Sequence, residues 1–424
     1  MNAPFLARAL IPRLPFFYGW VILACACCAG LSRQGGSVAT LSVFVTPMTE
    51  AFGWSRTAIS GAVSLGGILA AIASPMLGRF LDREGARLVL CVAILTTGLA
   101  NMALSLTLSL PMFYVLFCVA RLNFAGPFDL GIYGAVNNWF VARRAIANSI
   151  ATLGQMSGLV LLPMIASLAM VTSGWRAGWF AIGITVLLVG FVPVFLLMAR
   201  RPEDVGLVPD GGFVPRDLSG PVRPEPMFTR AQALRTRSFW AVSLFTVLAY
   251  PVQAGVSLHQ APFLLERGLS VTAAAGIVSW FSLMSGVASF AFGFMPRWIS
   301  VRVKLAMTGA LICAGTLLYP AVHSVTMAYV AATVFGWGIG GLLLMLPVAW
   351  ADYFGRRSYG AIRGIALTIQ VLAQASGPLI SGVLRDATGG YETALTCFAV
   401  LSGLSALAAI LASPPAVIQA GRSG

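Results

Sequence analysis

The sequence predicts an all-α integral membrane protein with twelve transmembrane helices in two pseudo-symmetric six-helix bundles. Three observations support this fold. The 424 residues are 58% hydrophobic and only 9% charged, whereas a soluble domain is about 25% charged, so lipid must form part of the solvent around the chain. The apolar residues fall into twelve long runs. The two halves of the chain also resemble each other.

Each apolar run predicts one spanning helix, because each is near or above the roughly 20 residues that cross a bilayer and none alternates like a barrel strand. In chain order the predicted spans are 19–45, 57–80, 87–108, 111–139, 145–168, 176–198, 238–263, 272–295, 303–321, 325–350, 360–384 and 391–412. Residues 1–198 and 238–424 are predicted to form the two bundles. Residues 199–237, which are rich in proline and charge, predict a cytoplasmic linker between them.

An internal repeat supports the division into two like halves. Three residues after the first span recur 215 positions later, after the seventh: Pro47, Gly53 and Ser55 match Pro262, Gly268 and Ser270. Same-direction repeats of this kind, related by an axis along the membrane normal, are typical of one class of transporter.

The loop charges predict the orientation. With the N-terminus inside, only Arg56, Arg176, Arg267 and Arg385 fall in outer loops, and Arg33 and Arg121 lie within spans. The other 21 of the 27 basic residues are then cytoplasmic, as positive residues of membrane proteins prefer. We therefore expect a multi-pass protein of the cell (inner or plasma) membrane with both termini inside and no cleaved signal peptide.

Several classes of function are excluded. The net charge of +14 is spread singly between apolar runs, which is not the pattern of a nucleic-acid-binding protein. The seven cysteines lie inside apolar runs without metal-ligand spacing. No nucleotide-binding loop and no hydrolase or metalloprotease motif is present. We expect no catalytic residues, no metal and no cofactor, and a monomer surrounded by lipid.

The loop between spans 2 and 3 resembles the signature G-x-L-x-D-R-x-G-x-R of the major facilitator superfamily. Here it reads Gly78-Arg79-Phe80-Leu81-Asp82-Arg83-Glu84-Gly85-Ala86-Arg87. Arg121 and Gly126 in span 4, and Gly154, Gly158 and Pro163 in span 5, are similar to further motifs of that superfamily. The resemblance covers essentially the whole chain and implies the two-bundle major facilitator fold.

Four stretches resemble the branch of monocarboxylate transporters and oxalate/formate antiporters, in particular its bacterial members. They are Phe17-Tyr18-Gly19-Trp20, Phe52-Gly53-Trp54-Ser55-Arg56, Trp139-Phe140 with Arg143-Arg144, and Arg201-Pro202-Glu203-Asp204-Val205-Gly206-Leu207 through Pro209-Asp210-Gly211. Two family features are missing. Span 8 (Val271 to Phe294) lacks the arginine that holds the substrate carboxylate in this branch, and Gln370 and Gln374 stand where the antiporters carry a lysine.

Ionisable residues within spans are candidate functional residues, because a charge at bilayer depth costs several kcal/mol. Arg33, beside Gln34 in span 1, is the hypothesised main anion anchor, since a guanidinium binds carboxylates bidentately. The alternative is an arginine paired to a helix end or an internal acid. Arg121 in span 4 is either a second anion contact or a structural residue. Asp129 is the proton-coupling candidate if it is buried without a cation, and otherwise bonds to neighbouring helices.

Polar residues on other spans are further candidates for substrate binding. His259 and Gln260 lie near the outer end of span 7, and Tyr250 precedes a proline at its middle. Gln370 and Gln374 share one face of span 11, and Gln155 lies in span 5. Each of these residues could instead hold helices together through hydrogen bonds.

The resemblance implies a cytoplasmic gate at the loop 2–3 signature. Asp82 is expected to face the positive N-terminal end of span 11, with Gly78, Arg83, Glu84, Gly85 and Arg87 completing the contact. The sequence thus favours a secondary transporter for a small organic anion, a monocarboxylate or related carboxylate, that works by alternating access with protons as a candidate co-substrate. The alternatives are an exporter of hydrophobic or drug-like compounds and a non-transporting membrane sensor or scaffold.

Overall fold

The computed structural model describes residues 4–212 and 225–415, and every regular element in these ranges is helical. Contacts divide the chain into two units, Met1–Glu225 with Arg356–Thr368 and Pro226–Gly355 with Ile369–Gly424. Most of the described part of the sequence-predicted linker therefore clusters with unit 1, and Pro226 onward clusters with unit 2. Residues 213–224 of that linker lie outside the described residues, as do three arginines of the orientation argument, Arg216, Arg223 and Arg422.

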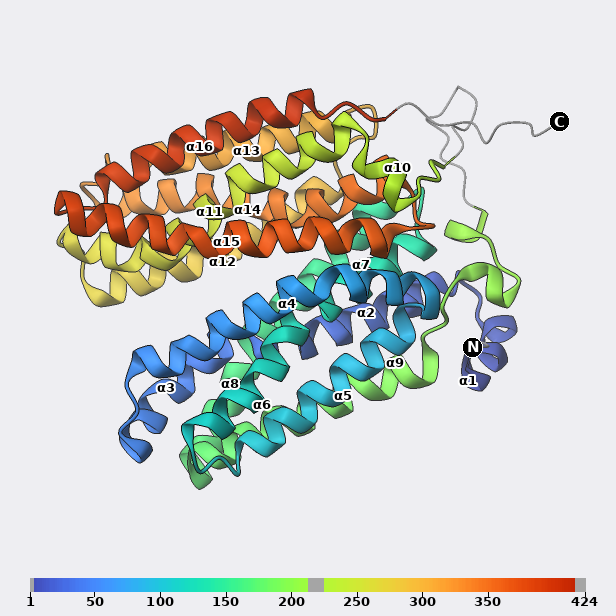
Figure 1. The fold of residues 1–424 in the computed structure, drawn as a ribbon, viewed down its shortest axis with the longest axis horizontal. Helices are drawn as coiled ribbons and strands as arrows, with labels where there is room; N and C mark the ends of the chain where they lie inside the picture. Colours follow the sequence, from blue (N-terminus) through green and yellow to red (C-terminus); the bar gives the residue numbers. More distant parts are fainter. Residues whose placement is uncertain (1–3, 213–224, 416–424) are drawn as a thin grey trace. The chain divides into compact units, whose positions relative to one another are not determined.

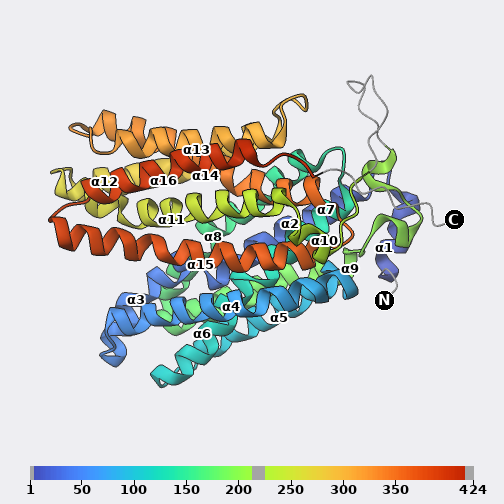
Figure 2. The same cartoon turned by 45° about the horizontal axis from the view of Figure 1, so that its top comes forward.

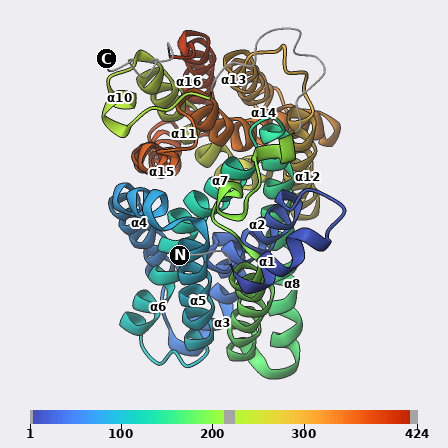
Figure 3. The ribbon, with the colours of Figure 1, turned by 90° about the vertical axis from the view of Figure 1, so that its right-hand side faces the viewer.

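Unit 1 is a helical bundle (Figure 1). Its elements are α1 (Phe5–Leu10), η1 (Ile11–Arg13), α2 (Gly19–Arg33), η2 (Gln34–Gly36), α3 (Val38–Phe52), α4 (Arg56–Glu84), α5 (Ala86–Leu104), α6 (Leu110–Ala125), α7 (Pro127–Trp139), α8 (Arg144–Thr185), η3 (Val186–Phe191), α9 (Val192–Leu197), η4 (Pro202–Val205) and η5 (Pro209–Gly212). Helix α2 packs on α7 and α8, α5 packs on α6, α7 and α8, and α4 packs on α6. Figure 3 looks onto the ends of these helices.

Unit 2 contains α10 (Arg230–Leu234), α11 (Arg237–Glu266), α12 (Val271–Gly293), α13 (Val301–Leu318), α14 (Val325–Phe354) and α16 (Glu392–Leu411). Helix α14 packs on both α12 and α13, and α16 packs on α11 and α13, as Figure 2 shows. Helix α15 (Tyr359–Thr388) is shared, because its first ten residues cluster with unit 1 and the rest with unit 2.

Eleven helices of the described residues are long and apolar enough to cross a membrane. The longest, Arg144–Leu197, has 54 residues, which is far more than one bilayer crossing needs. Its backbone leaves the helical region at Ser173 (φ −143°, ψ 17°) and Gly174 (φ 76°, ψ 177°). This helix therefore supplies two crossings, and the prediction of an all-α fold with twelve spans is confirmed.

The internal repeat reappears in the backbone. Gly53 and Gly268 both end a helix with positive φ, at 69° and 80°. Gly174 and Gly389, which are again 215 residues apart, have φ of 76° and 78°. Ser109 and Ser324 both cap a helix through the side-chain oxygen. The two halves of the sequence therefore begin and end their helices at matching positions.

Two spans of unit 1 are broken, where the sequence predicts continuous helices over 19–45 and 111–139. Helix α2 ends at Arg33, a 3₁₀ turn follows over Gln34–Gly36, and Ser37 is extended and caps α3 by accepting a bond from Thr40 N (3.0 Å). Helix α6 ends at Ala125, and Gly126 leaves the helical region (φ −118°, ψ −87°) before Pro127 starts α7. Breaks inside a membrane are tolerated where other groups satisfy the freed backbone.

Candidate functional site

The two helix breaks of unit 1 lie against each other. A side chain at Gly36 would bring its Cβ to 2.3 Å from the carbonyl oxygen of Ala120, so only glycine allows this approach. Two arginines satisfy the backbone that the breaks expose. Arg33 Nε donates to Phe124 O (2.9 Å), and Arg121 Nη1 lies 3.4 Å from Gly36 O. Each break is therefore held by an arginine from the other span.

Arg33 is fully engaged by its neighbours. Besides the Phe124 carbonyl, its guanidinium donates to Gln155 Oε1 and lies 3.6 Å from Asp129 Oδ2. Its centre also lies 4.6 Å from the centroid of the Phe124 ring. The side chain is 14% exposed, so it is largely enclosed. These contacts match the alternative interpretation of Arg33, which is an arginine paired to an internal acid.

Asp129 is paired to two cations. It lies in the first turn of α7 with its side chain 6% exposed, and its second oxygen, Oδ1, is 3.0 Å from Arg363 Nη2. The condition set for a proton-coupling role of Asp129, burial without a cation, is therefore not met. Arg363, which is 1% exposed, was assigned from the sequence to the cytoplasmic loops. It lies inside the predicted span 360–384, and that position is the signal that could have identified it as a buried charge.

Arg121 differs from Arg33 and Arg363 because no carboxylate of a described residue pairs with it. Its centre lies 4.6 Å from the centroid of the Phe124 ring, the same distance as that of Arg33. Its buried Nε makes no hydrogen bond among the described residues. Arg121 therefore keeps donor capacity for a further ligand.

Two glutamines complete this part of unit 1. Gln155 accepts from Arg33 and donates through Nε2 to Tyr133 Oη (3.1 Å). Gln34 is 5% exposed, and its Oε1 has no hydrogen-bond partner among the described residues. The structure thus brings together Arg33, Gln34, Arg121, Asp129 and Gln155 of the predicted site.

The other predicted binding residues belong to unit 2, where they make separate contacts. Gln374 Nε2 donates to Gln253 Oε1 (3.0 Å), and His259 Nδ1 lies 3.1 Å from Tyr391 Oη. Gln260, Tyr250 and Gln370 are buried, at 2%, 3% and 8% exposure.

Asp82 meets the start of α15. Its Oδ1 and Oδ2 accept from the backbone N–H groups of Gly360 and Ala361, both at 2.8 Å, where a helix N-terminus favours a negative charge. Gly78 allows the approach, since a Cβ there would lie 2.0 Å from Gly360 O. Further along the same helix, Thr368 Oγ1 donates to Ala71 O (2.6 Å).

The remaining residues of the loop 2–3 signature do not join this contact. Arg83 is exposed and Glu84 half-buried, and neither forms an ion pair with a described residue. Gly85 takes a positive φ of 89° where the chain turns into α5. Arg87 donates to Phe195 O (2.7 Å). Arg200, which the sequence did not single out for this place, donates to Asp82 O (2.9 Å).

Residues that resemble the monocarboxylate branch meet at one end of unit 1. Phe17 contacts Trp139 and Phe140, with ring centroids 5.9 and 5.7 Å apart, and Trp139 Nε1 donates to Ala199 O (3.3 Å). Asp210 accepts from three backbone N–H groups just before α8, those of Val141 (2.8 Å), Ala142 (2.6 Å) and Arg143 (3.0 Å). These motifs therefore build a structural joint between α2, α7, α8 and the linker.

Arg356 is held beside this joint by two linker carboxylates. It lies 2.5 Å from Glu203 Oε1 and 3.0 Å from Glu225 Oε2, and Arg144 lies 3.0 Å from Glu225 Oε1. Burial alone would raise the pKa of Glu203, but the hydrogen bond and charge of Arg356 outweigh burial, so that pKa is lowered. The same carboxylates raise the pKa of Arg356 despite its burial. We call Glu203, Glu225 and Arg356 the linker clamp.

Comparisons with known proteins agree with this architecture. The model of the Major Facilitator Superfamily matches residues 22–308. The chain is 26% identical over 402 residues to monocarboxylate transporter 11 of Homo sapiens, covering 91% of this chain and 81% of that protein. It is 24% identical over 380 residues to the oxalate:formate antiporter of Oxalobacter formigenes, covering 84% of each.

Among solved structures, the human organic anion transporter MFSD10 superposes with a TM-score of 0.70 at 16% identity, covering 93% of this chain and 99% of that one. This likeness shows a shared fold. The family match covers most of the chain and confirms the resemblance predicted from the loop 2–3 signature. The chain is a multi-pass membrane transporter rather than an enzyme, and it belongs to the Major Facilitator Superfamily.

Proposed function

We propose that the protein is a secondary transporter of a small organic anion, and that the anion binds at the helix breaks of unit 1. The observation that carries this proposal is the charge of the cluster formed by Arg33, Arg121, Arg363 and Asp129. Three guanidinium groups meet one carboxylate there, which leaves an excess of positive charge in a largely buried place. Uncompensated buried charge is costly, and a bound anion would reduce that cost.

Within this site we assign the first contact with the anion to Arg121. Arg33 already donates to Phe124 and Gln155 and pairs with Asp129, so its donors are largely occupied. Arg121 retains an unpartnered Nε among the described residues and shares the Phe124 ring with Arg33. An anion beside Phe124 would meet Arg121 first and then the edge of Arg33, with the Gln34 carboxamide nearby in the chain.

The relatives support a carboxylate as the substrate class. Proteins similar to this chain are named for monocarboxylates and for oxalate and formate. A carboxylate offers two oxygens to the planar guanidinium fork. The arginine of span 8 is missing here, so we assign its role to Arg121 and Arg33 of unit 1.

We extend the proposal to coupling and gating. A protonated Asp129 carries no charge and would form no ion pair with Arg33 or Arg363, so proton uptake would weaken this contact with α15. The start of α15 is also held by Asp82, Gly78 and Thr368. We propose that these contacts form and break as the transporter alternates its access. Both termini would lie in the cytoplasm.

Thermal unfolding of the purified protein against a panel of carboxylates tests the anion site. A ligand at about 100 times its dissociation constant stabilises the folded state by about 2.7 kcal/mol. We expect at least one carboxylate to raise the unfolding temperature of the wild type, and Arg121→Gln to abolish that shift. Arg235→Gln removes an exposed arginine at the end of α10 and should keep it.

Two outcomes would contradict the proposal. If carboxylates shift the unfolding temperature of Arg121→Gln as much as that of the wild type, Arg121 is not the anchor. If no carboxylate shifts the wild type and none is taken up into proteoliposomes, the substrate class is wrong.

A further inference from the structure

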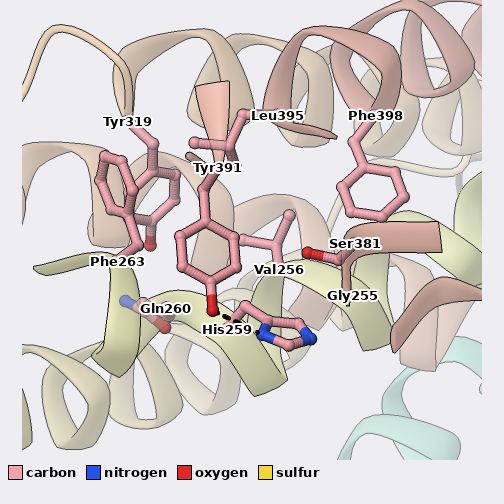
Figure 4. A pocket seen from close by; sticks show the side chains of 10 residues that line it. All are labelled: Gly255, Val256, His259, Gln260, Phe263, Tyr319, Ser381, Tyr391, Leu395 and Phe398. Atoms are coloured by element: carbon pink, nitrogen blue, oxygen red, sulfur yellow. Dashed lines mark hydrogen bonds between the residues drawn. The ribbon is translucent and has the colours of Figure 1, made fainter. Parts of the chain in front are cut away.

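A small pocket in unit 2 lies at the end of α11 and shares no residue with the proposed anion site (Figure 4). Its cavity volume is about 10 Å³, which is room for about one water molecule. Apolar side chains form much of its wall, including Phe263, Leu395 and Phe398. The polar groups that line it are His259, Gln260, Tyr319, Ser381 and Tyr391.

Two of these polar groups are deeply buried and incompletely bonded. Gln260 is 2% exposed, and neither atom of its amide has a hydrogen-bond partner among the described residues. Tyr319 is 1% exposed, and its hydroxyl faces the Gln260 amide without completing a hydrogen bond. Buried polar groups of this kind cost free energy unless a polar guest binds them. The pocket is therefore built to hold a small polar species.

A second, wider cavity of about 450 Å³ adjoins the pocket and is lined by Glu266, Arg267 and Glu392. The two cavities share Phe263 and Tyr391 as their common wall. We call the wider cavity the vestibule. His259 Nδ1 lies 3.1 Å from the Tyr391 hydroxyl, so Tyr391 both lines the vestibule and contacts the imidazole.

The charges around the vestibule favour a cation. The ion pairs there join Arg267 to Glu392 (2.6 Å), Arg385 to Glu266 (3.0 Å) and Arg385 to Asp386 (3.4 Å). These pairs contain three carboxylates and two guanidinium groups, so their net charge is that of one carboxylate. Tyr319 at the end of α13, His323 beyond it and Tyr391 before α16 are further titratable groups of unit 2. Helix α13 also carries Arg302 and Lys304 in its first turn, and α12 carries no charged residue.

We propose that His259 is a proton-binding site of this transporter, reached from the vestibule through Tyr391, with one water in the small pocket. The Tyr391 hydroxyl passes its proton to Nδ1 and takes one from a hydronium ion in the vestibule, which remains there as water, so the phenol is regenerated and the imidazole gains one proton and one positive charge. Under the proposed orientation the vestibule faces the outside. This assignment does not depend on which anion is carried.

Tyr391 suits the role of donor. Burial, reinforced by Glu266, raises the pKa of its hydroxyl, so the group stays protonated at neutral pH. The water in the pocket would be held by Gln260 and Tyr319, whose unpartnered atoms line it, and would help to solvate the charged imidazole.

The chain has only two histidines, His259 and His323, which makes a direct test possible. Histidine-labelled protein in nanodiscs should show two imidazole NMR signals, and the His323→Gln variant leaves that of His259 alone. We expect this signal to change as the imidazole gains a proton within the range of about pH 4 to 9. Tyr391→Phe should move its midpoint by more than about half a pH unit, whereas the signal of the exposed His323 should be the same in that variant as in the wild type.

A His259 signal that does not change between about pH 4 and 9 would overturn the proposal, and so would a midpoint that Tyr391→Phe leaves unaltered. This result is independent of the anion-binding test, because no substrate is present. Once a substrate is known, His259→Gln should reduce the dependence of uptake on external pH from about tenfold per pH unit to less than about twofold. An unchanged pH profile would remove His259 from the transport cycle.

Discussion

At the scale of residues, Arg33 and Arg121 are the same amino acid in matching surroundings, yet their contacts differ. Both lie beside Phe124 and both reach a backbone carbonyl of the opposite helix break. Only Arg33 also faces Asp129. The sequence predicted that both arginines are embedded, because each lies inside an apolar run. It could not predict which one Asp129 neutralises, since that depends on how α2, α6 and α7 fold together.

The partner of Asp129 in α15 was still harder to predict. Asp129 and Arg363 are 234 residues apart, and local pattern contains no information on such a pairing. Arg363 also lies close to the start of its helix, next to a predicted cytoplasmic loop, and arginines are frequent in such loops. Its exposure of only 1% became visible only in the three-dimensional structure.

Replacing Asp129 by asparagine should destabilise the protein strongly. The neutral side chain would leave Arg33 and Arg363 buried without their shared carboxylate, and breaking a buried pair in this way costs about 3–5 kcal/mol. Adding Arg363→Gln to Asp129→Asn should recover part of the loss, because one uncompensated charge is removed. Unfolding of the purified protein in detergent, followed as a double-mutant cycle, measures both effects.

Asp386→Asn is the matched control for this cycle. Asp386 is 77% exposed and pairs with Arg385, so its loss should change stability by less than about 1 kcal/mol. If Asp129→Asn is as stable as this control, Asp129 does not have the role that we assign to it, which is to neutralise Arg33 and Arg363.

At the scale of elements, the helices were largely predictable and their interruptions were not. Long apolar runs identify spans because lipid requires about 20 apolar residues for each crossing. The breaks at Gln34–Ser37 and Gly126 occupy only a few residues within such runs. Glycine is common in continuous membrane helices as well, so Gly35, Gly36 and Gly126 alone do not reveal that the backbone leaves the helix there.

The contact between α4 and the start of α15 depends on glycine. A Cβ on Gly360 would lie 2.3 Å from Gly78 O and 2.8 Å from Asp82 Oδ1. Gly360→Ala should therefore separate the start of α15 from α4 and weaken the Asp82 hydrogen bonds. We expect hydrogen exchange of residues 359–368 to increase by about tenfold or more, which corresponds to a loss of about 1.4 kcal/mol in local stability.

Gly382→Ala lies in the same helix and is the control, since a Cβ there would meet nothing within 4 Å. Its exchange in residues 359–368 should match that of the wild type. Equal exchange in Gly360→Ala would show that the close approach does not hold the start of α15.

The linker clamp should loosen in acid. The pKa of Glu203 is lowered from its ordinary value of 4.5 by Arg356, so the pair stabilises the folded state above that value and its contribution is lost as the pH falls through the lowered pKa. The effect is modest because Glu203 is 46% exposed. Glu203→Gln should reproduce the acid state at neutral pH.

Hydrogen exchange of residues 201–212, corrected for its intrinsic pH dependence, measures this change. Exchange should rise in the wild type below about pH 4 and in Glu203→Gln at about pH 7. Asp204→Asn, which changes an exposed neighbour, should leave it unaltered. The clamp would be refuted by equal protection in Glu203→Gln and wild type at neutral pH.

At the scale of the whole molecule, the distribution of positive charge supports the proposed orientation of the protein in the membrane. The outer loops of the proposed topology contain Arg176, Arg267 and Arg385, and each of these is already committed to a local contact. Arg176 donates to the carbonyls of Ser105 and Thr107, and the other two form ion pairs. Exposed arginines of the proposed cytoplasmic side, such as Arg8, Arg79 and Arg83, can meet lipid headgroups, which favours the positive-inside arrangement.

Reporter fusions test this orientation. A phosphatase that folds only outside the cell should be inactive when fused after residue 412, at the end of α16, and active when fused after Gly268, between α11 and α12. A fluorescent protein that folds only in the cytoplasm should show the reverse. An odd number of crossings separates the two points in the proposed topology, so they must lie on opposite sides of the membrane.

Phosphatase activity at both points would require an even number of crossings between them and would contradict that topology. Activity only after residue 412 would invert the orientation, and the vestibule beside His259 would then open to the cytoplasm.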